Sequence, residues 1–214
     1  MVTTVIFDMD GVLVDSQKLQ YKAYNTVLTN YGFPIPAKDW VLWIHHSMGG
    51  NEWIKRNNLP LDPHRIREEK KIIYDRLIDE EMELKPGVRE LIGLLKKNNY
   101  RLCIASASRK ESIDRIVGKF HLEDAFEYLL SDRDVTLPKP HPHIFLEAAR
   151  LMGAEPNECV VIEDSLAGLK AAKSAQMKCI ICPDIWDGDN TIEYPGADII
   201  VNSLEDVTLD MMTG

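Results

Sequence analysis

Beyond Pro86-Gly87, this 214-residue chain alternates between short apolar runs and amphipathic helical patterns. The apolar runs are typical of buried strands, while the segments between them place apolar side chains at helical spacing. Strands separated by helices of this length indicate βαβ units and a parallel sheet. The predicted helices cover residues 88–97, 110–119, 143–152 and 166–174. The predicted strands cover residues 101–106, 128–130, 159–162, 178–182 and 198–201.

The first strand of this sheet is expected at the start of the chain, before a long helical interruption. Residues 5–7 form an apolar run that reads as a fully buried strand. Residues 16–82 follow with helical periodicity and no strand-like alternation. We therefore predict an α/β fold, in which residues 1–15 and 83–214 form a Rossmann-like parallel sheet core. The inserted residues 16–82 form a separate helical domain.

The charge balance restricts the partners of this chain. Its 25 Lys and Arg residues against 34 Asp and Glu residues give a net charge of −9. Such an acidic protein is a poor ligand for nucleic acid or for an anionic membrane. No apolar run approaches the ~20 residues of a membrane span, and no basic segment of a secretion signal precedes the first strand.

The four cysteines all lie in apolar, strand-like runs. Cys179 and Cys182 have a C-x-x-C spacing, but this spacing falls inside a predicted strand rather than at a turn or helix start. Buried reduced thiols are therefore favoured over a zinc site or redox chemistry. Reduced thiols indicate a cytoplasmic protein.

Two carboxylates follow the first strand directly. Asp8 and Asp10 are two residues apart, and Gly11 comes next, where the chain leaves the sheet. Ligands of open α/β sheets gather outside the carboxyl ends of the strands. Two acids at this edge repel each other unless a cation or a shared proton offsets their charge, which indicates a divalent metal. The alternative is an ordinary Asp-rich turn.

Other polar residues follow later predicted strands or lie between them. Ser106 ends one strand and could instead be a helix N-cap, while Lys139 could be an exposed loop lysine. Glu163 and Asp164 end another strand and could form a surface turn or a helix start. Taken together, these residues supply carboxylates for Mg²⁺, a hydroxyl for a phosphoryl group and a lysine that balances charge.

These residues carry a resemblance to a known family. The sequence resembles the haloacid dehalogenase (HAD) superfamily, and within it the branch of beta-phosphoglucomutase and phosphoglycolate phosphatase, which carries a helical cap after the first strand. The resemblance covers essentially the whole chain. It rests on four motifs in the family's order, namely DMDGVLVDS at residues 8–16, Ser106 after its strand, Lys139-Pro140 and Glu163-Asp164-Ser165.

The resemblance implies roles for the carboxylates. Asp8 would be the nucleophile that forms an aspartyl-phosphate. Asp10 would be the general acid and base for the leaving oxygen and the attacking water. Asp8, the backbone carbonyl of Asp10, and Asp164, with Glu163 directly or through water, would hold Mg²⁺ as oxygen ligands.

The resemblance also implies how the phosphoryl group is held. Ser106 and the Ala107 amide would bind its oxygens. Lys139 would steady both Asp8 and the phosphoryl charge. The helical insertion would be a cap that closes over the site and expels water.

Substrate recognition is expected from a loop of the insertion. In this loop His45, His46, Gly49 and Gly50 are candidates for contact with the substrate. The alternative is that the two histidines are ordinary surface residues. We expect the partner to be a small phosphorylated metabolite, and we expect a monomer.

The choice of reaction lies between a phosphatase and a mutase. Family members that remove halogens lack the second acid, so the presence of Asp10 argues against dehalogenation. Beta-phosphoglucomutase grips a second phosphate with an arginine and a histidine of its cap, whereas this chain has Glu52 and Gln20 near those places. An acid facing a phosphate is repulsive. We therefore predict a small-molecule phosphatase, with the mutase second, and a non-catalytic protein on the same scaffold as a third alternative.

Overall fold

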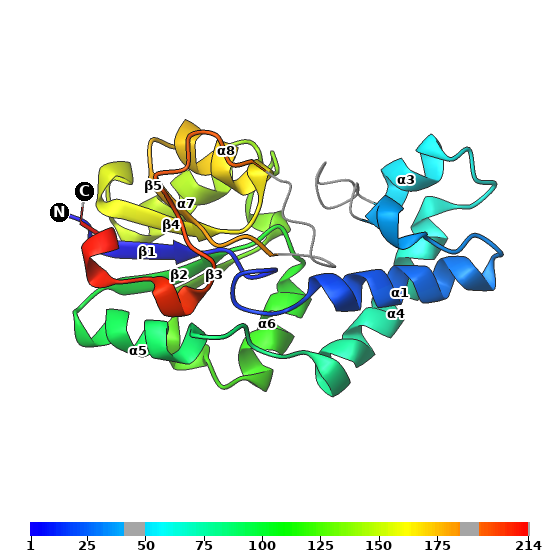
Figure 1. Cartoon of the computed structure of the whole chain (residues 1–214), viewed down its shortest axis with the longest axis horizontal. Coiled ribbons are helices and arrows are strands. Elements are labelled where there is room, and N and C mark those ends of the chain that lie inside the picture. The colour runs from blue at the N-terminus through cyan, green and yellow to red at the C-terminus, as the bar shows by residue number, and fades with distance from the viewer. Residues whose placement is uncertain (41–49, 185–192, 214) are drawn as a thin grey trace. The chain divides into compact units, whose positions relative to one another are not determined.

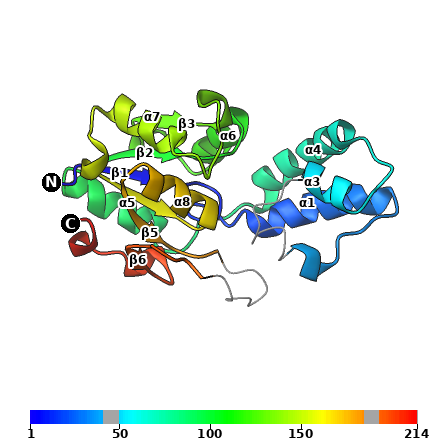
Figure 2. The ribbon, with the colours of Figure 1, turned by 90° about the horizontal axis from the view of Figure 1, so that it is seen from above.

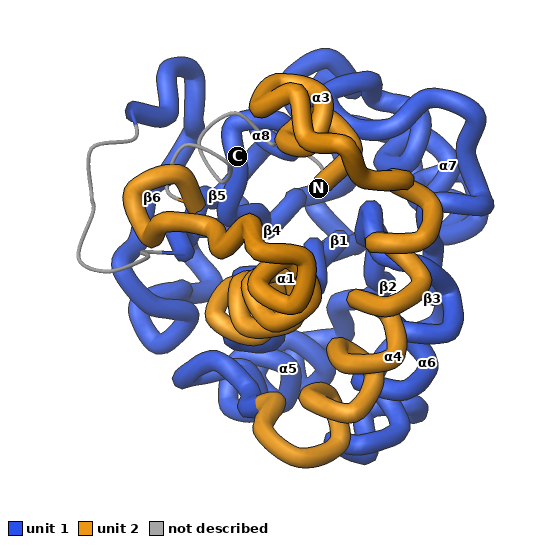
Figure 3. The backbone as a smooth tube through the Cα atoms, turned by 90° about the vertical axis from the view of Figure 1, so that its right-hand side faces the viewer, with its two compact units in different colours: residues 1–15, 83–184, 193–214 blue, residues 16–82, 185–192 orange. Residues whose placement is uncertain are grey.

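The computed structural model describes residues 1–40, 50–184 and 193–213 of the chain, which divides into two compact units (Figure 3). The first, called the core unit below, comprises Met1–Asp15, Glu83–Asp184 and Glu193–Gly214. The second, called the helical unit, comprises Ser16–Met82 together with residues 185–192. No helix in the described part of the chain combines the length and the apolar character that a membrane crossing requires.

The core unit is built on a parallel sheet, as predicted. Among the described residues the sheet has six strands in the order β3-β2-β1-β4-β5-β6, and all of its pairings are parallel. The first strand of the chain therefore lies in the middle, between β2 and β4, which both follow the helical insertion. The strands are β1 (Thr4–Phe7), β2 (Arg101–Ala105), β3 (Tyr128–Leu130), β4 (Cys159–Glu163), β5 (Lys178–Ile181) and β6 (Ile199–Ile200).

Helices cover both faces of this sheet. Helices α5 and α6 lie on one face, and α7 and α8 lie on the other (Figure 1). The view from above in Figure 2 shows α8 over the strands. The four helices are α5 (Val88–Lys97), α6 (Lys110–Lys119), α7 (His143–Met152) and α8 (Leu166–Ser174). Because the sheet is covered on both faces, β1 and β4 are buried along their whole length, and residues 5–7 and 159–162 in them read as continuous apolar runs.

Short 3₁₀ helices complete the connections of the core unit. They are η1 (Glu123–Ala125), η2 (Asp132–Asp134), η3 (Pro156–Glu158), η4 (Leu204–Asp206) and η5 (Leu209–Met211). One of them, η2, begins just after β3 and is closed by reciprocal hydrogen bonds of Ser131 and Asp134. The Asp132 N–H also donates to the Ser108 carbonyl over 3.1 Å, which ties this segment to the turn after β2.

The predicted strand ends differ slightly from the observed ones. Strand β2 ends at Ala105, one residue before Ser106, although the Ser106 N–H still donates to the Leu130 carbonyl over 3.1 Å. In the same way, the Cys182 N–H donates to the Glu163 carbonyl over 2.8 Å although β5 has ended. Both residues lie one position beyond the regular strand, where the chain is still buried and still makes one hydrogen bond to the neighbouring strand.

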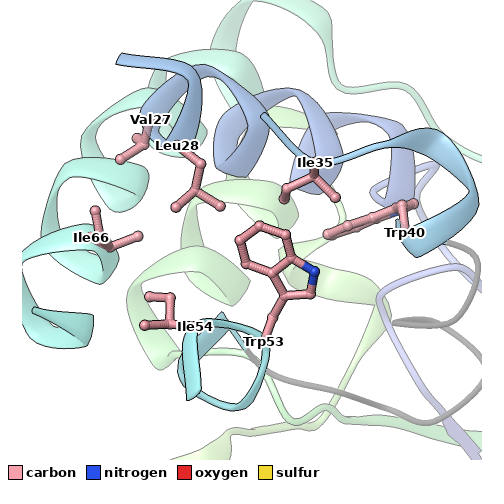
Figure 4. Packing of buried hydrophobic residues seen from close by; sticks show 7 residues of the cluster. All are labelled: Val27, Leu28, Ile35, Trp40, Trp53, Ile54 and Ile66. Carbon is pink, nitrogen blue, oxygen red and sulfur yellow. The ribbon is translucent and has the colours of Figure 1, made fainter. Parts of the chain in front are cut away.

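The helical unit has its own apolar core. Its described helices are α1 (Gln17–Asn30), α3 (Gly50–Arg56) and α4 (Pro63–Glu81). Helix α4 begins where Asp62 accepts a hydrogen bond from the His64 N–H and Pro63 occupies the first turn. Figure 4 shows the indole of Trp53 within the buried cluster. This cluster consists of Val27, Leu28, Ile35, Trp40, Trp53, Ile54 and Ile66.

The cysteines are buried in the core unit, as the apolar runs around them predict. Cys103, Cys159, Cys179 and Cys182 are all free thiols. Burial raises the pKa of Cys182 to about 11, so this thiol is protonated and unreactive at neutral pH. The C-x-x-C pair therefore packs as two small apolar side chains.

Candidate active site

The register of the central strands aligns the residues at their carboxyl ends. Phe7 of β1 is paired with Ile104 on one side and with Ile162 on the other. The next residues along the three strands, Asp8, Ala105 and Glu163, therefore lie at the same level of the sheet. Asp8 continues this pairing, since its N–H donates to the Ile162 carbonyl over 2.9 Å.

Lys139 joins the three aligned strand ends. Its Nζ lies 2.5 Å from Asp8 Oδ1 and 2.7 Å from Glu163 Oε1. It also donates to the backbone carbonyl of Ala105 over 3.0 Å. Only 7% of the Lys139 side chain is exposed, so the interpretation as a solvent-exposed loop lysine is wrong.

Glu163 is held on both of its oxygens. While Oε1 faces Lys139, Oε2 accepts hydrogen bonds from the Asp164 N–H, the Ser165 N–H and the Ser165 hydroxyl, each over 2.9 Å. Gly168 is required beside it, because a Cβ there would come within 1.8 Å of the Glu163 carboxyl carbon. Glu163 is buried, so it is not part of a surface turn.

Burial and charge shift the pKa values of this group in opposite directions. Burial raises the pKa of Asp8 to about 7, against the opposing effect of Lys139. Burial alone would lower the pKa of Lys139, but the charges of Asp8 and Glu163 outweigh it and raise that pKa. Burial would also raise the pKa of Glu163, but the Lys139 charge and the hydrogen bonds lower it. One lysine therefore offsets two buried carboxylates only in part.

The remaining negative charge fits a divalent cation. Oxygen atoms of Asp8, Glu163 and Asp164 all lie within 4.8 Å of one another. Burial and the neighbouring acids raise the pKa of Asp164 well above its ordinary value. A hard cation such as Mg²⁺ prefers oxygen ligands and would relieve this repulsion. Since Glu163 already uses both oxygens, Asp8 and Asp164 have more freedom to bind a metal.

Gly11 provides the space beside this cluster. Its φ of +78° is unfavourable for other residues, and a Cβ there would come within 2.2 Å of Asp164 Oδ2. The glycine of the first motif therefore allows both the turn after Asp10 and the close approach of Asp164. The sequence suggests the turn but gives no sign of the contact.

Ser106 and Ser108 lie beside Asp10. The Ser108 hydroxyl donates to Asp10 Oδ2 over 2.5 Å, and the Ser106 hydroxyl does so over 3.5 Å. Ser106 Oγ also accepts the Ser108 N–H over 3.0 Å. Ser106 is not a helix N-cap, because α6 begins only after Arg109. Sequence reasoning missed Ser108, and the signal available was a second serine in the same turn.

Ala107, predicted to offer its amide to a phosphoryl oxygen, lies at a cavity together with Lys139. The cavity has a volume of about 210 Å³. It is lined by Ala107, Asp132, Val135, Thr136, Pro138, Lys139 and Ile144. Of the predicted site residues, only Ala107 and Lys139 line this cavity, while the acids Asp8 and Glu163 meet Lys139 at the carboxyl ends of β1 and β4.

A further acid of this region was not predicted. The Asp184 side chain is only 6% exposed, and its Oδ1 lies 2.7 Å from Lys85 Nζ. Its Cβ is 3.0 Å from the position of a Cβ on Gly11, so it approaches the first motif closely. Burial raises the pKa of Asp184, although Lys85 opposes this shift. Nothing in the local sequence around Asp184 distinguishes it from a turn residue.

The predicted substrate loop is described only at its end. His45, His46 and Gly49 lie outside the described residues. Gly50 is the first residue of α3 and is buried against Tyr24, where a Cβ would come within 2.6 Å of the ring. In the structure Gly50 thus allows helix packing, and its role in substrate binding stays a prediction.

Known proteins of one family are similar to this chain. A family model described as haloacid dehalogenase-like hydrolase matches residues 2–176. The chain is 32% identical to hexitol phosphatase B of Escherichia coli (strain K12) over 100% of this chain and 97% of that protein. It is 28% identical to beta-phosphoglucomutase of Bacillus subtilis (strain 168) over 97% of this chain and 92% of that one.

A solved structure is similar over nearly the full length. The crystal structure of CbbY from Rhodobacter sphaeroides in complex with phosphate has a TM-score of 0.86 and 27% sequence identity. The match covers 99% of each chain. It therefore includes both the sheet and the helical segment.

Proposed function

This chain belongs to the haloacid dehalogenase-like hydrolase family, and from that premise we propose that it is a Mg²⁺-dependent phosphatase of small phosphorylated metabolites such as sugar phosphates. The observation that carries the proposal is the contact of Lys139 Nζ with both Asp8 and Glu163 at the carboxyl edge of the sheet. This contact sets a nucleophile, a cation and a buried carboxylate in one place. Relatives named as phosphatases support the same class of reaction.

The first step forms a phosphoryl-enzyme. A carboxylate oxygen of Asp8 attacks phosphorus while the bond from phosphorus to the ester oxygen breaks. Asp10, in its protonated form, gives its proton to that ester oxygen, so the product leaves as an alcohol. Lys139 stabilises the charge of Asp8 before attack and of the phosphoryl oxygens during transfer.

The second step returns the enzyme to its starting state. Asp10, now a carboxylate, takes a proton from a water molecule as its oxygen attacks phosphorus. The bond between phosphorus and the Asp8 oxygen breaks, which releases inorganic phosphate and restores the Asp8 carboxylate. Ser106 and the Ala107 amide hold the phosphoryl oxygens in both steps.

Mg²⁺ would be held by Asp8, the Asp10 carbonyl and Asp164, and Glu163 would orient this group through Lys139 and Ser165. When bound, the ion supplies positive charge that keeps Asp8 ionised and neutralises the transferring phosphoryl group. The raised pKa values of Asp8 and Asp164 support this need for a cation.

We assign to the helical unit the role of a cap that reads the substrate and excludes water. The four buried, free thiols support a reducing compartment such as the cytoplasm. The acidic chain, with its net charge of −9, supports a small metabolite rather than nucleic acid as partner.

A phosphosugar mutase is the second candidate. In the helical unit, Gln20 accepts a hydrogen bond from Lys70, whose ammonium also lies 4.1 Å from the centre of the Tyr74 ring. This cation is the observation that favours a site for a second phosphate. Glu52, exposed in the first turn of α3, opposes it by charge. The sequence similarity to a beta-phosphoglucomutase also supports this candidate.

A substrate panel decides between these functions. Purified protein is assayed for phosphate release from hexitol phosphates, sugar phosphates, phosphoglycolate and nucleotides, with Mg²⁺ and with EDTA. We expect Mg²⁺-dependent release from one or more sugar or polyol phosphates. Conversion of beta-glucose 1-phosphate to glucose 6-phosphate without net release would establish the mutase. Absence of both reactions across the panel would contradict the proposal and favour a non-catalytic protein.

A further inference from the structure

Asp184 is a buried acid that the proposed mechanism leaves without a role. Its side chain is only 6% exposed, and its Oδ1 lies 2.7 Å from Lys85 Nζ. The other oxygen, Oδ2, is buried and has no hydrogen-bond donor within the described part of the chain. A carboxylate oxygen that is removed from water without a donor is costly. A donor bound at this position would therefore stabilise Asp184.

Asp184 lies next to the carboxylate of Asp164. The position that a Cβ on Gly11 would take is 2.2 Å from Asp164 Oδ2 and 3.0 Å from Asp184 Cβ, so both acids border Gly11. Burial raises the pKa of Asp164 most, and the charges of neighbouring acids, Asp184 among them, raise it further. A cation bound by Asp164 would therefore attract the charge of Asp184 as well.

Asp184 stands outside the group of acids that can share one ion directly. Among the described residues, the acids whose oxygens lie within 4.8 Å of one another are Asp8, Glu163 and Asp164. Mg²⁺ usually keeps several of its waters, and groups around a metal site orient its ligands through hydrogen bonds. A water bound to the ion is thus the donor that fits Asp184 Oδ2.

The orientation of the Asp184 carboxylate is set through the first motif. Lys85 follows the helical segment in the chain, and its N–H donates to the Leu13 carbonyl over 3.0 Å. Lys85 Nζ in turn donates to Asp184 Oδ1 over 2.7 Å. Because Oδ1 is held in this way, Oδ2 has a defined direction. The turn that follows Asp8 therefore also orients this second acid.

We propose that Asp184 is a positioning residue of the metal site, which accepts a hydrogen bond from a Mg²⁺-bound water through Oδ2 and so keeps the ion beside Asp164. The inference rests on the proposed function, because it assumes that Asp8 and Asp164 bind Mg²⁺. It assigns the acids different roles. Asp8 and Asp164 bind the ion itself, while Asp184 binds one of its waters.

Mg²⁺ binding tests this role without any substrate. Isothermal titration calorimetry with Mg²⁺ alone compares the wild-type protein with D184N, which keeps the size of the side chain but removes its charge. We expect the Kd for Mg²⁺ to rise by about 10- to 100-fold in D184N, as is typical when an outer partner of a metal site is removed. The control D114N removes an exposed carboxylate paired with Lys110 and should leave the Kd within about twofold. An unchanged Kd in D184N would overturn the proposal.

Urea unfolding separates this role from a purely structural role of the pair of Lys85 and Asp184. If the pair only stabilises the fold, D184N loses the same stability in EDTA as in Mg²⁺. Under the proposal, Mg²⁺ above the wild-type Kd stabilises D184N less than the wild-type protein, because weaker binding contributes less to the folded state. An equal stabilisation of both proteins by Mg²⁺ would contradict the proposal.

A crystal structure of the wild-type protein grown with Mg²⁺ decides the question even if D184N does not fold. We expect a water bound to the ion within hydrogen-bond distance of Asp184 Oδ2. Direct coordination by Asp184, or an ion whose waters all lie out of reach of Oδ2, would show that the inference is wrong. Should the wild-type protein bind Mg²⁺ but hydrolyse no phosphate ester, the proposed function fails, and this structure still decides the role of Asp184.

Discussion

The candidate site of the core unit and the interior of the helical unit are stabilised by different interactions. At the site, Lys139, Asp8 and Glu163 are ionisable, and their side chains are 7%, 8% and 1% exposed. In the helical unit the buried cluster is apolar, and ion pairs such as Lys22 with Glu81 stay on the surface, with side chains 52% and 41% exposed.

The buried charges of the site serve the proposed chemistry, whereas the apolar cluster of the helical unit serves packing. A buried charge tolerates loss of its partner poorly, because the remaining charge is left without compensation. An apolar cluster tolerates changes that conserve its volume. The site therefore has little freedom to vary, whereas a unit built on packing can change its surface residues and keep its fold. Variation in substrate is expected from the helical unit for this reason.

The largest effect is expected from Asp8→Asn. The amide is similar in size but cannot attack phosphorus, so turnover should fall by at least about a thousandfold while the fold stays intact. Phosphate release and circular dichroism check this together. The control is Asp114→Asn, which alters an exposed carboxylate paired with Lys110. Wild-type turnover in Asp8→Asn would remove Asp8 from the nucleophile role.

Lys139→Met should cost stability as well as activity. It leaves Asp8 and Glu163 facing each other without a cation, which we expect to lower the free energy of unfolding by about 3–5 kcal/mol. Lys173→Met removes a lysine from a partly exposed pair with Asp198 and should cost no more than about 1 kcal/mol. Urea unfolding of both variants makes the comparison. Equal losses of unfolding free energy in the two variants would show that burial of the Lys139 contacts adds nothing to stability.

The metal-free protein should lose stability as pH rises. Folding raises the pKa of Asp8 from 3.8 to about 7, so the folded state keeps a proton that the unfolded chain has lost. The stabilisation of the folded state by this proton is complete below about pH 4 and is lost as pH passes 7. At about 1.36 kcal/mol per pKa unit, the loss is up to about 4 kcal/mol.

Urea unfolding in EDTA between pH 4.5 and 8 measures this dependence. Asp8→Asn should flatten the curve, and saturating Mg²⁺ should oppose the loss in the wild-type protein at the upper end. If the two metal-free curves are parallel, Asp8 does not carry the pH dependence.

The smallest effect is expected in the helical unit. Ile54→Val removes one methylene from the apolar cluster and should cost about 0.5–1.5 kcal/mol, with kcat within about twofold of the wild-type value. Urea unfolding and the phosphatase assay check both values. A loss of turnover as large as that of Asp8→Asn would contradict the separation of packing from chemistry.

Sequence reasoning reached the architecture because strands and helices leave local signals. Apolar runs such as residues 159–162, followed by amphipathic segments, predict a parallel sheet whatever the strand order. The acids after β1 and β4 could be predicted for a related reason, since polar residues directly after buried strands gather at one edge. The order β3-β2-β1-β4-β5-β6 could not, because strand pairing joins residues far apart in the chain.

Ser108, Asp184 and the burial of Lys139 depend on approaches between distant segments. Lys139 meets Asp8 from 131 positions away, and Ser108 meets Asp10 from 98 positions away. The resemblance implied the contact of Lys139 with Asp8, whereas for Ser108 the sequence offered only a second serine in the same turn. The sequence by itself determined which residue types stand at each strand end and in what order. Only the tertiary structure decided which of them touch, because strand register and turn anchoring set those distances collectively.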